Sequence, residues 1–180
     1  MADELDLGEV LAERKQPEES VTFYLNEELQ YAKSVLQERI LKSTADNVDS
    51  IEAELDEVNA ALEQCKYTIV LRGLPQRMRE DINSKALARF PVKPNFMGYD
   101  DSANAKQRAE LENLMLLQKS IVKLVKVSTG AEKTQWTDEE VEKFNGTLSL
   151  GALKKIDESI KSLAEKVNAN AIATLDPSFG

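Results

Sequence analysis

The segment VDSIEAELDEVNAALEQC, residues 48–65, has apolar residues spaced alternately three and four positions apart. Because an α-helix makes one turn in 3.6 residues, this spacing places the apolar side chains on one helix face. These seam positions are Val48, Ile51, Leu55, Val58, Leu62 and Cys65. The segment therefore predicts a helix with one apolar seam, which packs against another helix of this chain or of a partner.

The polar positions of the same helix are acidic. They hold Asp46, Asp49, Glu52, Glu54, Asp56, Glu57 and Glu63, and no Lys or Arg occurs from Ala45 to Cys65. A negative face beside an apolar seam is typical of an interaction surface. An intramolecular seam with a solvated acidic face fits the same residues, so both alternatives stay open.

The residues before this helix predict its intramolecular partner. The short β-branched and aromatic run VTFYL (21–25) predicts a strand, and Asn26 suits the N-cap of a helix over 26–43. That helix has an apolar face of its own, made by Leu29, Ala32, Leu36 and Ile40. The polar residues STADN (43–47) predict a turn, so helices 26–43 and 46–65 should form an antiparallel hairpin.

The rest of the chain predicts further helices and strands. YTIVL (67–71) alternates like a strand, and Pro75 suits the first position of a helix that reaches Phe90. After a polar loop over 93–104, a helix from near Ala105 to about Ser120 contains LMLL (114–117), which we expect at the centre of the core. The run IVKLVKV (121–127) fits either a third strand or an extension of that helix.

Two helices should close the chain. Thr137 and Glu140 have the spacing of a capping box, and Trp136 and Val141 that of a hydrophobic staple. The last helix has a second apolar seam at three- and four-residue spacing, before the Asn-Ala-Asn residues 168–170. This seam consists of Leu153, Ile156, Ile160, Leu163 and Val167.

These elements predict a mainly α fold with a small β component: a helical hairpin plus a compact helical core with two or three short strands. We expect an acidic flexible N-terminal arm over 1–19 and a C-terminal tail over 176–180. A single mostly helical domain should occupy 20–175 and include the hairpin, 26–65.

Composition excludes several functions. The 180 residues contain 23 Lys and Arg against 32 Asp and Glu, a net charge of -9, which argues against nucleic-acid binding. With no His and one Cys, imidazole-based catalysis and the usual zinc sites lack their residues. We therefore expect no enzyme, no catalytic residue, no metal and no cofactor. No apolar run approaches the roughly 20 residues of a membrane span, so we expect a cytoplasmic protein that binds no membrane.

One stretch of the chain is basic. Between Arg72 and Lys93 only Glu80 and Asp81 oppose six basic residues. The six are Arg72, Arg77, Arg79, Lys85, Arg89 and Lys93. This stretch could pair with the acidic hairpin, bind an acidic partner, or form a solvated surface.

Several motifs give the chain a family resemblance. VTFYLNEEL (21–29), TIVLRGLP (68–75), ARFPVKP (88–94), LMLLQKSIVKL (114–124) and TLDPSFG (174–180) resemble tail assembly chaperones of long-tailed (siphovirus-type) bacteriophages of actinobacteria. The resemblance implies a protein of the host cytoplasm that binds the long helical tape-measure protein and keeps it soluble for tail-tube assembly. A structural head-tail or tail component, a coiled-coil adaptor and a self-associating protein are the alternatives.

The apolar seams and the start of the basic stretch are the candidate partner-binding residues. They are Val48, Ile51, Leu55, Val58, Leu62, Arg72, Arg77, Arg79, Leu153, Ile156, Ile160 and Leu163.

Overall fold

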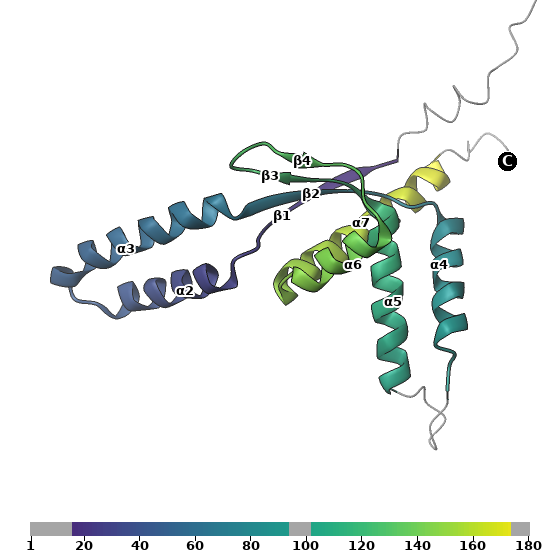
Figure 1. The fold of residues 1–180 in the computed structure, drawn as a ribbon, viewed down its shortest axis with the longest axis horizontal. Helices are drawn as coiled ribbons and strands as arrows, with labels where there is room; N and C mark the ends of the chain where they lie inside the picture. The colour runs from purple at the N-terminus through teal and green to yellow at the C-terminus, as the bar shows by residue number, and fades with distance from the viewer. Residues whose placement is uncertain (1–15, 94–101, 174–180) are drawn as a thin grey trace, which may run out of the picture.

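A four-stranded antiparallel sheet organises the chain (Figure 1). The computed structural model describes residues 16–93 and 102–173. The strands, which lie side by side in sequence order, are β1 (Glu18–Tyr24), β2 (Lys66–Arg72), β3 (Ile121–Lys126) and β4 (Glu132–Lys133). Val21 of β1 lies opposite Ile69 of β2, and Ile69 lies opposite Leu124 of β3.

Each of the first two strand connections contains a helical hairpin. Helices α2 (Glu27–Lys42) and α3 (Ala45–Gln64) separate β1 from β2, and α4 (Gln76–Arg89) and α5 (Ser102–Ser120) separate β2 from β3. Figure 1 shows the two hairpins leaving the sheet in different directions, with α2 and α3 at the left and α4 and α5 below. We call α2 and α3 the projecting hairpin. The predicted mainly α class with a small β component is confirmed.

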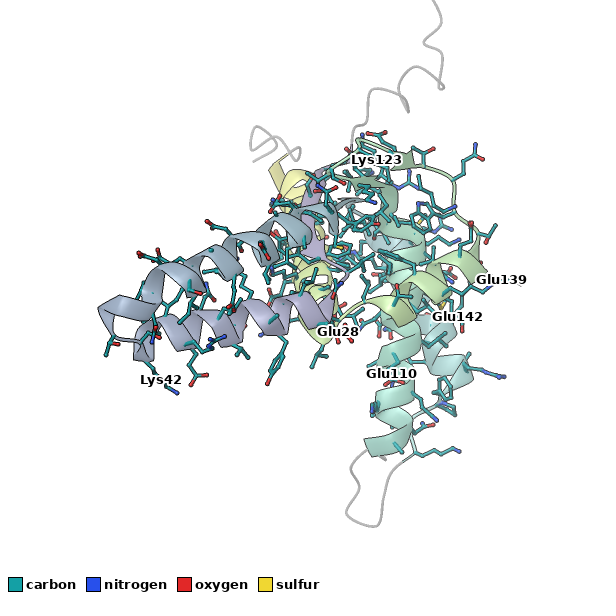
Figure 2. All side chains as sticks on the ribbon, turned by 60° about the vertical axis from the view of Figure 1, so that its left-hand side comes forward. Glu28, Lys42, Glu110, Lys123, Glu139 and Glu142 are labelled. Carbon is teal, nitrogen blue, oxygen red and sulfur yellow. The ribbon has the colours of Figure 1, made fainter. Side chains whose placement is uncertain are left out.

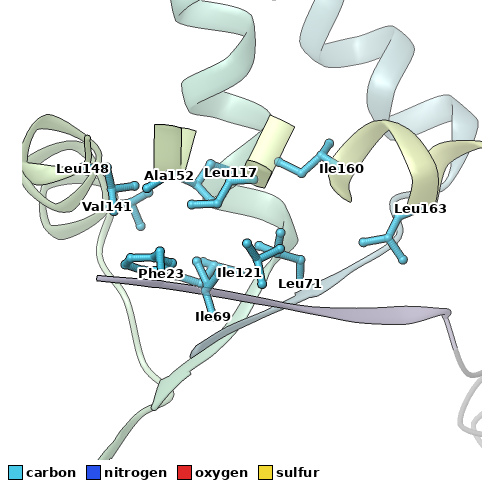
Figure 3. Close-up of a cluster of buried hydrophobic side chains, with 12 residues drawn as sticks. Phe23, Ile69, Leu71, Leu117, Ile121, Val141, Leu148, Ala152, Ile160 and Leu163 are labelled. Atoms are coloured by element: carbon cyan, nitrogen blue, oxygen red, sulfur yellow. The ribbon is translucent and has the colours of Figure 1, made fainter. Parts of the chain in front are cut away.

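The hydrophobic core lies between one face of the sheet and the two last helices, α6 (Asp138–Thr147) and α7 (Leu150–Ala173) (Figure 3). Alternate residues of β1 and β2 point into it, because successive strand side chains face opposite sides. Phe23 is 3% exposed, and Ile69 and Leu71 are fully buried. On the other face the exposed hydroxyls of Thr22 and Thr68 lie 3.0 Å apart and form a hydrogen bond.

The predicted capping box is confirmed. The hydroxyl of Thr137 accepts a hydrogen bond from the backbone N–H of Glu140 (3.2 Å), and the Glu140 carboxylate accepts one from the backbone N–H of Thr137 (2.9 Å). A hydrogen bond from Lys133, and then that backbone N–H, lower the pKa of Glu140. Trp136 packs against the core with its ring centroid 5.4 Å from that of Phe144.

The structure corrects several predicted boundaries. The first strand begins at Glu18, so it includes the last two residues assigned to the N-terminal arm; residues 1–15 and 176–180 lie outside the described residues. Pro75 is the N-cap of α4, which ends at Arg89. Helix α5 begins at Ser102, and α7 continues past residues 168–170 to Ala173.

Two predictions about residues 105–127 are now decided. The run after Ser120 is strand β3, because its backbone pairs with β2. The expectation that LMLL (114–117) lies at the centre of the core is confirmed in part, since Leu117 belongs to the core and Leu114 and Leu116 pack against it. Only Leu117 is buried, and the other three are partly exposed, because α5 extends past the sheet to pack against α4.

The absence of a side chain at Gly73 allows the end of β2 to lie close to α7. Its backbone N–H donates to the carbonyl of Pro17 (2.8 Å). A Cβ atom added there would lie 2.5 Å from Cγ2 of Val167, 3.1 Å from Cγ of Pro17 and 3.4 Å from the carbonyl oxygen of Leu163. A larger residue fits only if the side chain of Val167 or helix α7 shifts.

We therefore expect Gly73→Ala to lower the free energy of unfolding by about 1–3 kcal/mol, through overpacking. Urea unfolding followed by Trp136 fluorescence measures this change. Gly146→Ala is the matched control, since a Cβ there meets nothing within 4 Å. Equal stability of the two variants would contradict the close approach at Gly73.

Candidate binding surface on the projecting hairpin

The base of the projecting hairpin is tied to the sheet. The backbone N–H of Leu25 donates to the carbonyl of Cys65 (3.1 Å). The carboxylate of Glu63 accepts hydrogen bonds from Lys66 (2.9 Å) and from the hydroxyl of Tyr24 (3.2 Å). The hydrogen bond from Lys66, more than that from Tyr24, holds the pKa of Glu63 below its usual value.

The cap residues of α2 and α3 behave differently from each other. As predicted, Asn26 caps α2, with its side-chain oxygen accepting from the backbone N–H of Leu29 (3.0 Å). Cys65 was expected as a buried member of the seam. It is instead the C-cap of α3 and only half-buried, since the helix ends at Gln64 as the chain turns into β2.

The seam of α3 is buried along one line only. Ile51 and Leu62 are 5% and 3% exposed, and they pack in the same hairpin as the buried Leu36 of α2. Val48, Leu55 and Val58, the other seam residues, are only half-buried. Two helices can cover only the residues on their line of contact, so the flanks of this contact remain open.

The projecting hairpin stands apart from the core. Within the described ranges, no residue of α2 or α3 belongs to the main hydrophobic core. Figure 2 shows the hairpin extending past the sheet with charged and polar side chains along its outer surfaces. Tyr31 and Leu41 of α2 are 74% and 86% exposed. The hairpin therefore offers a long surface with apolar residues beside carboxylates.

The apolar seam of α7 packs mainly inside the protein. Ile156, Ile160 and Leu163 are buried in the core, and Leu153 packs partly against it. For these four residues the structure favours internal packing over contact with a partner, because α7 packs on β1 and β2 and its seam covers the sheet. Periodicity identified the apolar face correctly but not the surface that it meets.

The start of the basic stretch lies elsewhere on the molecule. Arg72 donates from Nε to the carbonyl of Lys119 (3.4 Å), and Arg79 donates from Nη2 to Oδ1 of Asn168 (2.7 Å). Arg77 is exposed on α4. In the described part of the chain, the ion pairs of α3 instead join Glu54 to Arg39 and Glu63 to Lys66. Among the described residues, Arg72, Arg77 and Arg79 therefore make no ion pair with the acidic hairpin.

Sequence reasoning missed one groove, between α5, α6 and α7. This hollow of about 430 Å³ has an apolar floor that includes Leu117 and Ile156, and Leu150 at its edge is 84% exposed. Asn113 donates to the carboxylate of Asp157 (3.2 Å), and partial burial raises the pKa of that carboxyl group. The sequence gives no sign of the groove, because α5 and α7 are joined only by the tertiary fold.

Two features are absent from the described residues. These residues contain no group of three or more His, Cys, Asp or Glu side chains arranged to hold a metal ion. Among the same residues, no helix has the length and apolar character needed to cross a membrane. The groove has one partly buried carboxyl group, whereas the projecting hairpin presents an extended face. This extended face is the candidate binding surface.

Comparison with known proteins identifies no relative: no family model matches the chain, and neither curated proteins nor solved structures give a match.

Truncation of the seam should show its uneven burial. We expect Ile51→Ala to lower the free energy of unfolding by about 2–4 kcal/mol, as for a buried aliphatic residue. Leu55→Ala, at a half-buried position of the same helix, should cost about 1 kcal/mol. Urea unfolding followed by far-UV circular dichroism compares the two. An equal loss of unfolding free energy in both variants would mean that the seam is evenly buried. It would contradict an open flank on α3.

Proposed function

We propose that the protein is a non-enzymatic assembly chaperone that binds a long helical partner and keeps it soluble until the partner is used. The observation that supports this proposal best is the projecting hairpin, whose apolar seam is only partly covered. A long helix with an apolar stripe aggregates when the stripe is exposed, and an amphipathic helix pair can cover such a stripe. The net charge of -9 would keep the complex in solution through mutual repulsion.

The sequence resemblance to tail assembly chaperones suggests the partner. A tape-measure protein is such a long helical chain, and it is enclosed only when the tail tube polymerises around it. In this proposal the protein acts in the host cytoplasm, in several copies along one partner, and leaves before the particle is complete. The acidic helices and the lack of His fit a protein that acts by binding.

Co-expression with a long helical protein encoded beside this chain tests the proposal. We expect the chain to raise the soluble yield of that partner and to co-purify with it in more than one copy. Replacing Val48 and Leu55 together by Ser should weaken capture about tenfold, since two half-buried apolar side chains leave the surface. Quantitative mass spectrometry of the purified complex measures the ratio.

Leu150→Ser is the matched control, because it removes an exposed apolar residue of α7, outside the hairpin. This variant should capture the partner as the wild type does. Equal capture by the Val48/Leu55 variant would contradict the hairpin as the binding surface. Recovery of the chain at fixed stoichiometry from finished particles, without capture of the partner, would favour a structural component instead.

A further inference from the structure

The acidic residues of α3 include a regular stripe beside the seam. Four seam residues are each followed directly by a carboxylate, and the carboxylates repeat the seam spacing with one gap. They are Asp49, Glu52, Asp56 and Glu63, and the gap is filled by Asn59. We call these four the acidic stripe. Each helical residue is rotated by about 100° from the one before it, so the stripe runs parallel to the seam along one flank of α3.

The same flank contains the open side of the seam. Ile51, which is buried against α2, defines the direction of the hairpin contact. Leu55 and Val48 are rotated from it by about 40° and 60° toward the acidic stripe, by the same helical geometry. Both are half-buried, as expected at the edge of the contact. An apolar edge and a row of carboxylates thus lie side by side on one flank of α3.

The opposite flank is occupied by an ion pair. Glu54 is rotated by about 60° from Ile51 in the other sense. Its carboxylate lies 3.4 Å from Nη1 of Arg39, so this pair bridges α2 and α3. On the stripe side, Glu63 pairs with Lys66 at the base of the hairpin. Across the described ranges, Asp49, Glu52 and Asp56 are exposed and make no ion pair.

We propose that the hairpin binds its partner as a third helix on the acidic-stripe flank, and that this partner helix borders its apolar stripe with Lys or Arg. This inference rests on the proposed function and adds the position and the charge of the bound segment. Apolar contact with Val48 and Leu55 would give affinity, while the carboxylates would select basic flanks and speed association.

Charge complementarity favours a basic helix over α3 of a second copy of this chain. A second hairpin on this flank would bring its own acidic α3 against the stripe, and like charges at a helix interface oppose association. Helix α3 has no Lys or Arg that could neutralise the carboxylates of the acidic stripe. A partner with basic flanks neutralises the carboxylates and leaves the seam to drive binding.

Two synthetic helical peptides of about 20 residues, long enough to span the stripe, test the inference with the full chain. Both have Leu at alternating three- and four-residue spacing; one has Lys at the flanking positions and the other has Glu. We expect the Lys peptide to bind at least about tenfold more tightly in about 0.1 M salt, where such charges are only partly screened. Fluorescence anisotropy measures both affinities.

The protein variants localise the effect. Glu52→Gln with Asp56→Asn should weaken binding of the Lys peptide about three- to tenfold, as expected for two exposed charge pairs. The control is Glu139→Gln with Glu142→Gln, which removes the same charge from exposed positions on α6 (Figure 2). It should change the affinity less than about twofold, because these positions are distant and screened.

Three results would overturn the inference: no binding of the Lys peptide, equal binding of both peptides, or equal effects of the two double variants. The long partner could still be captured through Val48 and Leu55 in that case. The result would then contradict the preference for a basic partner helix but not the proposed function. A dimer in sedimentation equilibrium that Leu55→Ser dissociates would assign this flank to a second copy, and would also overturn the inference.

Discussion

The antiparallel pairing of β1 with β2 is the constraint on which the rest of the structure depends. It places the two ends of the projecting hairpin side by side, and the hydrogen bond from Leu25 to Cys65 closes the base. The same pairing aligns Phe23, Ile69 and Leu71 on the face that α6 and α7 cover. One pair of strands therefore builds the core on one side and supports a long helical extension at its end.

The core and the projecting hairpin differ in how they are stabilised. Residues of the core meet several elements, whereas α2 and α3 meet mainly each other, so the hairpin buries only one line of side chains. A region with few buried contacts opens more easily than the core and can adapt to a partner. In the proposed function, incomplete burial of Val48, Leu55 and Val58 costs a little stability and leaves these residues available to a partner.

Much of this architecture could be predicted from local patterns. Three- and four-residue spacing predicts the hairpin, the Thr137 and Glu140 pair predicts the start of α6, and alternation predicts β1 and β2. What the patterns could not predict is the surface that each apolar face meets. The seams of α3 and α7 have the same spacing, yet Ile160 is buried against the sheet while Leu55 is only half-buried. Residues 121–126 form a strand only because β2 offers a free edge, which is a tertiary property.

The most direct test of this account removes the hairpin. Leu25 and Cys65 already lie at hydrogen-bonding distance, so an Asn-Gly turn can join them in place of residues 26–64. The account predicts that the shortened chain unfolds in one cooperative transition reported by Trp136 and no longer captures a long helical partner. Loss of the folded core would show that the hairpin is not a separate extension. Retained capture of the partner would contradict the hairpin as the binding surface.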